Sequence, residues 1–275
     1  MAGSVGAFPI GRYLPSRSRK MVGPFIFMDL GGPIEVPAGV TEGGAPEHPH
    51  AGLSTFTYLM NGSIQHTDSA GNRAIVEPGD VALMTSGSGI THEELPPGNI
   101  DPTQPRIVEF AQMWLALPDE VEESDPTFQL VRADDLPTVD LAGGSARITM
   151  GTGWGVTAPT DIFTDTVFAE LNVAPGGTIA VEPTWEERAL ILLEGTATLN
   201  DRPMKSLDLP VLEPSSTVRI SSSTGARLLL FGGERFPSER HIAGSFVASS
   251  ADKIHQWMAD YSSGDFPSID RSQFS

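Results

Sequence analysis

Cysteine is absent from this sequence of 275 residues. Without a thiol the chain can form no disulfide framework, zinc–thiolate site or iron–sulfur cluster, and it has no cysteine nucleophile. Any metal site must therefore use nitrogen and oxygen ligands, which histidine and the acidic side chains supply.

Basic residues are scarce: 17 lysines and arginines stand against 35 aspartates and glutamates, a net charge of −18. Phosphate backbones and anionic lipids would repel such a chain, so we expect no direct nucleic-acid binding and no membrane binding. No run of 18 apolar residues predicts a transmembrane helix. Residues 1–15 lack the basic and apolar regions of a secretory signal, and we expect a cytoplasmic protein.

Glycine (29) and proline (23) make up nearly a fifth of the chain, where roughly 12% is usual. This density of helix breakers argues against a helical bundle and favours an all-β fold of short strands and tight turns. Asn61-Gly62 is a hairpin signal, and residues 68–72 form another turn. The spacing is typical of a sandwich or barrel, with strands expected at 53–60, 63–67, 81–84, 90–95, 106–117, 166–173, 189–193, 196–199 and 227–231.

An acidic stretch at residues 118–125 divides the β-rich sequence into halves, which predicts domains at 1–125 and 126–275. Residues 58–62 and 191–195 resemble each other weakly, as after duplication of one barrel unit. The end of the chain differs, because Ile254, Trp257, Met258 and Tyr261 recur at helical spacing. Ser249 or Ser250 as N-cap and Gly264 beyond the last turn complete the signature of a short C-terminal helix.

The histidines suggest a chemistry. In an extended segment, residues i and i+2 point to the same face, so His48 and His50 place two imidazoles side by side. His92 and Glu94 form a second same-face pair. On adjacent strands inside a barrel, these four side chains would surround one divalent ion, and Fe(II), Mn, Co, Ni, Cu and Zn all suit three nitrogens and a carboxylate.

An alternative is that these histidines bind no metal, because a lone His-x-His pair is more often a surface feature than a metal site. His66 is either a fifth ligand or a hydrogen-bonded turn histidine. Counting from Gly195 by the spacings of the first half reaches no ligand, and no histidine lies between His92 and His241. The second barrel is therefore expected to be free of metal and structural.

Five segments of the first half carry a resemblance to a known family. In order and spacing they resemble the signature of the pirin family within the cupin superfamily. A further likeness lies in residues 241–247 and the helix after them. The segments of the first half are residues 48–58, 66–72, 78–81, 84–94 and 111–118.

The resemblance implies two cupin barrels (double-stranded β-helix, or jelly roll) arranged face to face, with metal in the N-terminal barrel alone. It assigns the ligands to His48, His50, His92 and Glu94 and implies iron as the usual metal. The sequence departs from the family at Ala51 and Ser54, where members often have Arg and Glu. These departures concern the substrate more than the metal.

Some members of the family are quercetinases, and a eukaryotic member is a nuclear, redox-sensitive transcription cofactor. The first hypothesis is therefore a dioxygenase that opens the ring of quercetin or a related phenolic with O₂. Glu94 is its candidate catalytic base, because a carboxylate can loosen from the metal to accept a proton. Phe56, Tyr58 and Met60 share one strand face and are candidates for an apolar substrate wall. The same pattern would also fit ordinary core residues. A bulge at Gly52 would turn these side chains to the other face of the strand.

Two alternatives remain open. One is a non-enzymatic, metal-bearing redox sensor that acts through a protein partner. The other is a metal-free structural protein, against which the four intact ligand positions argue.

Overall fold

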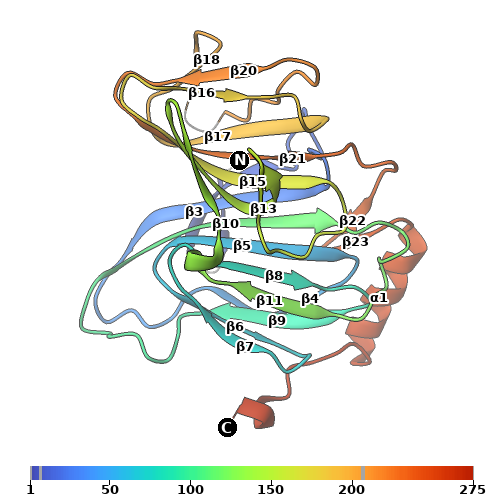
Figure 1. The fold of residues 1–275 in the computed structure, drawn as a ribbon. Helices are drawn as coiled ribbons and strands as arrows, with labels where there is room; N and C mark the ends of the chain where they lie inside the picture. Colours follow the sequence, from blue (N-terminus) through green and yellow to red (C-terminus); the bar gives the residue numbers. More distant parts are fainter. Residues whose placement is uncertain (1, 6–7, 206–207, 275) are drawn as a thin grey trace. The chain divides into compact units, whose positions relative to one another are not determined.

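Strands dominate the computed structural model, which describes residues 2–5, 8–205 and 208–274. The chain forms two compact units (Figure 1). The first comprises Met1–Arg17, Ile26–Ala133 and Pro237–Ser275, and the second comprises Ser18–Phe25 and Asp134–Phe236. The expected all-β class with a short C-terminal helix is confirmed.

The first unit is built on two main sheets. The seven-stranded sheet has the order β1-β2-β3-β10-β5-β8-β11, and the four-stranded sheet has the order β4-β9-β6-β7. The strands are β1 (Ala2–Val5), β2 (Phe8–Leu14), β3 (Phe25–Val36), β4 (Ala45–His50), β5 (Leu53–Asn61), β6 (Ile64–Asp68), β7 (Arg73–Val76), β8 (Val81–Thr85), β9 (Ile90–Leu95), β10 (Arg106–Ala116) and β11 (Thr127–Val131).

A hydrophobic core holds these two sheets together. Leu59 and Val108 from the larger sheet share one buried cluster with Val76 from the smaller sheet, and Ile64 packs against it. Strands that alternate inward and outward residues produce such a core when two sheets meet face to face. The space between the sheets is therefore where inward side chains of β4, β5, β9 and β10 converge.

The C-terminal segment packs on the first unit. The hairpin of β22 (His241–Ala243) and β23 (Phe246–Ala248) leads into helix α1 (Ala251–Ser263) and a 3₁₀ turn, η2 (Arg271–Phe274). Phe246 and Trp257 join a buried cluster with Ala51. Buried Glu122 accepts hydrogen bonds from Ser249 Oγ at 2.7 Å and Lys253 Nζ at 2.6 Å. The unit boundaries thus differ from the expected 1–125 and 126–275, because these long-range contacts return the tail to the first unit.

Helix α1 has the expected ends. The side chain of Ser250 accepts from the backbone N–H of Lys253, and Gly264 adopts a left-handed conformation after the last turn. Of the four residues expected to form the apolar stripe, Ile254 and Trp257 are buried. Met258 and Tyr261 are about half exposed, at 44% and 47%. The helix therefore contacts its unit along a narrow face.

The second unit repeats the two-sheet plan. One sheet has the order β12-β13-β15-β21-β17, with β14 paired to β13, and the other has the order β16-β20-β18-β19. A 3₁₀ turn, η1 (Ala133–Asp135), spans the sequence boundary at which the first unit ends and the second begins. The strands are β12 (Thr138–Leu141), β13 (Gly144–Gly153), β14 (Val156–Thr157), β15 (Thr166–Val173), β16 (Thr178–Val181), β17 (Glu187–Gly195), β18 (Thr198–Leu199), β19 (Arg202–Pro203), β20 (Val218–Ser221) and β21 (Ala226–Gly233).

In the described part of the chain, no helix has the length and apolar character needed to cross a membrane.

Candidate metal centre

Three histidines meet where β4 pairs with β9. The register of this antiparallel pair sets His48 opposite His92 and His50 opposite Ile90. Because β4 is extended, His48 and His50 lie on the same face, and their ring centroids are 4.9 Å apart. The ring of His92 lies 4.5 Å from that of His48 and 5.0 Å from that of His50. The structure thus brings together the histidines of both predicted pairs.

Backbone carbonyls orient two of these rings. His48 Nδ1 lies 2.7 Å from the carbonyl oxygen of Pro46, and His50 Nδ1 lies 3.0 Å from that of Ser245 in the tail. A carbonyl can only accept, so each Nδ1 carries a proton, and in a neutral ring Nε2 then keeps its lone pair. This is the state in which imidazole binds a metal ion.

Burial keeps the inner histidines neutral. Burial, assisted by the neighbouring His48, lowers the pKa of His50 to about 3. Burial also lowers the pKa of His92 well below its usual value, with smaller effects from the histidines around it. The Nε2 atoms of His48 and His92 lie only 3.1 Å apart. Converging imidazole nitrogens of this kind fit a divalent transition metal.

Glu94 faces the cavity from the far end of β9. It forms a second group of potential ligands with His66 and His92, while His48, His50 and His92 form the first; in each group the ligand atoms lie within 4.8 Å of one another. The two groups share His92. The predicted four side chains are therefore close, but Glu94 lies nearer to His66 and His92 than to the pair on β4.

A polar array surrounds the Glu94 carboxylate. Thr57 Oγ1 on β5 lies 2.9 Å from Glu94 Oε1 and 2.8 Å from Gln112 Oε1 on β10. A hydroxyl carries one proton, so Thr57 can donate to one of these two oxygens at a time. If Glu94 takes up a proton, it can donate to Thr57, and Thr57 can then donate to Gln112. With Gln112 Oε1 facing Thr57, protonation of the carboxyl group lets both contacts form at once.

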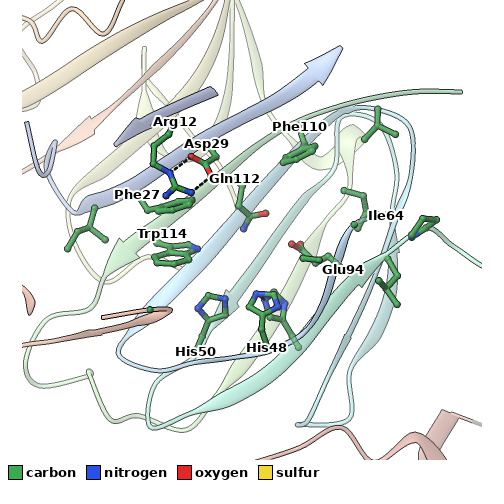
Figure 2. A pocket seen from close by; sticks show the side chains of 18 of the residues that line it. Arg12, Phe27, Asp29, His48, His50, Ile64, Glu94, Phe110, Gln112 and Trp114 are labelled. Carbon is green, nitrogen blue, oxygen red and sulfur yellow. Dashed lines mark hydrogen bonds and ion pairs between the residues drawn. The ribbon is translucent and has the colours of Figure 1, made fainter. Parts of the chain in front are cut away.

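The histidines open into a cavity of about 430 Å³. Phe27 on β3 stacks on Trp114 of β10, with ring centroids 4.1 Å apart and planes 13° from parallel. The Trp114 ring in turn meets His50 edge-on at 5.1 Å. Figure 2 shows the rings of His50, Trp114 and Phe27 in a row. Further apolar lining residues are Ile64, Leu95, Val108 and Phe110.

An ion pair ends this row of rings. Arg12 Nε and Nη2 donate to the two carboxylate oxygens of Asp29 at 2.8 and 2.7 Å (Figure 2). The guanidinium carbon lies 4.3 Å from the centre of the Phe27 ring, a cation–π contact. Burial raises the pKa of Asp29, and the contacts with Arg12 oppose this effect. The pair holds Phe27 from the side opposite Trp114.

The candidate substrate wall of Phe56, Tyr58 and Met60 does not line this cavity. The β5–β10 register pairs Thr57 with Gln112 and Phe56 with Met113, and directly paired residues share a face. The side of β5 that faces the cavity is therefore that of Thr57, while Phe56 and Tyr58 are buried.

The backbone at Gly52 explains the difference. Its φ of +73° turns the chain between β4 and β5, so the parity of His48 and His50 does not continue into β5. A Cβ at this position would lie 1.8 Å from the carbonyl oxygen of Val247.

Sequence reasoning did not single out Phe27, Gln112 and Trp114. Gln112 and Trp114 stand two apart and share a face of β10, which is a usable signal once one of them is placed in the site. Phe27 has no comparable signal, because only the sheet order brings β3 beside β10.

Both groups of potential ligands lie in the first unit. The second unit instead buries Arg188 on β17, whose guanidinium donates to the carbonyl oxygens of Glu182 at 2.7 Å and Ser216 at 3.2 Å. The carbonyl oxygen of Glu213 accepts a further, short hydrogen bond. This arginine ties two loops of the second barrel together.

Comparisons with known proteins agree with this description. The family model Pirin matches residues 7–115, and the model Pirin C-terminal cupin domain matches residues 168–267. A pirin-like protein of Caulobacter vibrioides is 35% identical over 274 residues, which cover 98% of this chain and 94% of the relative. A Pseudomonas aeruginosa protein with the name "Putative quercetin 2,3-dioxygenase" is 32% identical, covering 94% of this chain and 81% of the relative.

Solved structures show the same architecture. The crystal structure of a quercetin 2,3-dioxygenase from Acinetobacter baumannii has a TM-score of 0.89 at 32% identity, covering 98% of this chain and 89% of that chain. A bacterial pirin from Escherichia coli in complex with nickel(II) has a TM-score of 0.66 at 17% identity, covering 86% and 96%, and shows the fold alone. From the two family models and these relatives, this chain belongs to the pirin family and contains two cupin domains.

Proposed function

We propose that this protein is a metal-dependent dioxygenase that opens the ring of quercetin or a related flavonol with O₂. The observation that carries the proposal is the opening of three convergent histidines into a cavity walled by the Phe27–Trp114 stack. A flat phenolic ring system suits such a wall, because aromatic rings gain from offset stacking and edge contacts. The names of two relatives, both more than 30% identical, support the same activity.

The proposed ligands are His48, His50, His92 and Glu94, and iron is the proposed metal. A divalent ion at these ligands would supply Lewis acidity toward a flavonol oxygen and a site for O₂. Within the first unit, the carbonyl oxygens of Pro46 and Ser245 orient His48 and His50 for this role. His92 faces them from β9.

Glu94 is the proposed general base. Its carboxylate lines the cavity, where the hydroxyl of a bound flavonol would present its proton. Transfer of that proton to Glu94 completes the hydrogen bonds from Glu94 to Thr57 and from Thr57 to Gln112. The chain's own residues thus stabilise the protonated carboxyl that substrate deprotonation produces.

Quercetin turnover tests the proposal directly. Protein loaded in turn with iron, manganese, cobalt, nickel and copper is mixed with quercetin under O₂, and the loss of flavonol absorbance is followed. We expect turnover with at least one metal, and none in a His50→Ala variant treated in the same way. If wild-type protein of proven metal content turns over neither quercetin nor other flavonols, the proposed activity is wrong.

A further inference from the structure

We propose that Asp68 and His66 form a hydrogen-bond relay that fixes the tautomer of His92 and leaves its Nε2 ready to bind a metal. The inference rests on the proposed metal site, and it assigns a positioning role to two residues outside the expected ligand set. The whole relay lies in the first unit, on strands β6 and β9.

The relay begins at a buried carboxylate. Asp68 is 0% exposed, and its Oδ1 accepts hydrogen bonds from the backbone N–H groups of Ala70 at 2.9 Å and Asn72 at 3.0 Å. Its Oδ2 accepts from Asn72 Nδ2 at 2.9 Å and lies 3.0 Å from His66 Nε2. Burial alone would raise the pKa of Asp68, but the hydrogen bonds from His66 and Asn72 hold it below its usual value.

An ionised carboxylate can only accept, so His66 must carry its proton on Nε2. The other nitrogen of a neutral His66 ring, Nδ1, is then an acceptor. It lies 3.4 Å from Nδ1 of His92. Phe128 stacks on His66, with ring centroids 4.2 Å apart and planes 10° from parallel, and this contact holds the imidazole in plane.

The tautomer of His92 follows. If His66 Nδ1 accepts, His92 Nδ1 must donate, and a neutral His92 then has a bare Nε2. That Nε2 lies 3.1 Å from Nε2 of His48. The relay does for His92 what the carbonyls of Pro46 and Ser245 do for His48 and His50. Potential ligand atoms of these three residues lie within 4.8 Å of one another.

The strand register places the parts of the relay on one face. His66 is paired with Glu94, and Asp68 is paired with His92. His66 and Asp68 are thus a third i, i+2 pair beside His48/His50 and His92/Glu94. A carboxylate that orients a ligating histidine is a common support for metal sites, and its removal costs roughly 10–100-fold in metal affinity. Here a second imidazole stands between the carboxylate and the ligand.

The first test needs no metal. In metal-free wild-type protein with ¹⁵N-labelled histidine, long-range ¹H–¹⁵N correlation spectra report which ring nitrogen carries the proton. We expect the Nε2–H form for His66 and the Nδ1–H form for His92. Addition of Zn(II) should shift the Nε2 resonance of His92 and leave both nitrogens of His66 without a metal-binding shift. A doubly protonated His66, or binding of Zn(II) by His66, would overturn the proposal.

The second test reverses the relay. In Asp68→Asn, the amide oxygen can still accept from Ala70 and Asn72. The amide nitrogen, however, would donate to His66 Nε2, which must then accept. We expect the His66 and His92 tautomers to exchange and the affinity for Zn(II) to fall by roughly 10–100-fold. Thr67→Val is the matched control, because Thr67 is a buried neighbour on the same strand whose hydroxyl has no hydrogen-bond partner in the described part of the chain.

These outcomes separate the relay from the proposed activity. Unchanged tautomers and Zn(II) affinity in folded Asp68→Asn would contradict the relay while leaving flavonol oxidation untouched. Expected tautomers together with a lack of quercetin turnover would preserve the relay and remove the proposed activity.

Discussion

The Nε2 atoms of His48 and His92 lie 3.1 Å apart across the β4–β9 pair, while Nδ1 of His48 is 2.7 Å from the carbonyl oxygen of Pro46. Two ring nitrogens this close share a proton or face a cation, because two lone pairs at this distance repel. The carbonyl partner leaves His48 Nε2 without a proton when the ring is neutral. This relationship makes the β4–β9 pair the centre of the proposed site.

Glu94→Gln, loaded to the same metal content as the wild-type protein, should lose turnover. The amide keeps the shape of the side chain but cannot take up the substrate proton, so we expect kcat for quercetin to fall about 100-fold or more. Glu93→Gln is the control, because Glu93 bonds to Arg271 in the tail at 2.9 and 3.0 Å. Equal kcat values for the two variants would contradict the role of Glu94.

Trp114→Leu should weaken substrate binding. The change removes the stack on Phe27 and the edge contact with His50, and an aromatic contact contributes about 1 kcal/mol beyond area burial. We expect KM for quercetin to rise about fivefold, with kcat changed less. Trp185→Leu, which removes a buried tryptophan of the second unit, should leave KM unchanged; the reverse pattern would rule out the proposed wall.

Gly52→Ala should destabilise the first unit more than Gly39→Ala. Both glycines have positive φ, +73° and +88°, so both substitutions carry the backbone cost of that conformation, about 1 kcal/mol. A Cβ at Gly52 would lie 1.8 Å from the carbonyl oxygen of Val247, whereas nothing lies within 4 Å of one at Gly39. Denaturant unfolding should show the difference, and equal losses would contradict the close approach at Gly52.

Arg188→Met should lower stability without affecting the metal. The variant removes the buried guanidinium that donates to the carbonyl oxygens of Glu182, Glu213 and Ser216, and we expect the free energy of unfolding to fall by about 3 kcal/mol. Exposed Arg219→Met should cost less than about 0.5 kcal/mol. Loss of metal from folded Arg188→Met would show that the second unit takes part in the site.

The two same-face pairs could be placed from the sequence because side-chain parity along a strand is a local property. His48 and His50, like His92 and Glu94, share a face for that reason. The register that sets His48 opposite His92 is not local. Gly52 breaks the parity between β4 and β5, so the apolar wall belongs to Phe27 and Trp114 and not to Phe56.

The tail shows the same limit of sequence reasoning. The helix and its caps follow from spacing and from Ser250 and Gly264. Its return to the first unit depends on buried Glu122, which is far from Lys253 in sequence. The roles of His66 and Asp68 also required the structure, because the contact between His66 and His92 joins two strands.

Metal analysis of protein purified without an affinity tag tests the central claim most directly. Wild-type protein, after exposure to divalent transition metals and removal of the excess, should contain about one ion per chain, the number that one set of converging nitrogen and oxygen ligands holds. His92→Ala, in the same treatment, should contain almost none. Equal metal content in the two proteins, whether near zero or near one, would contradict a metal site at these histidines.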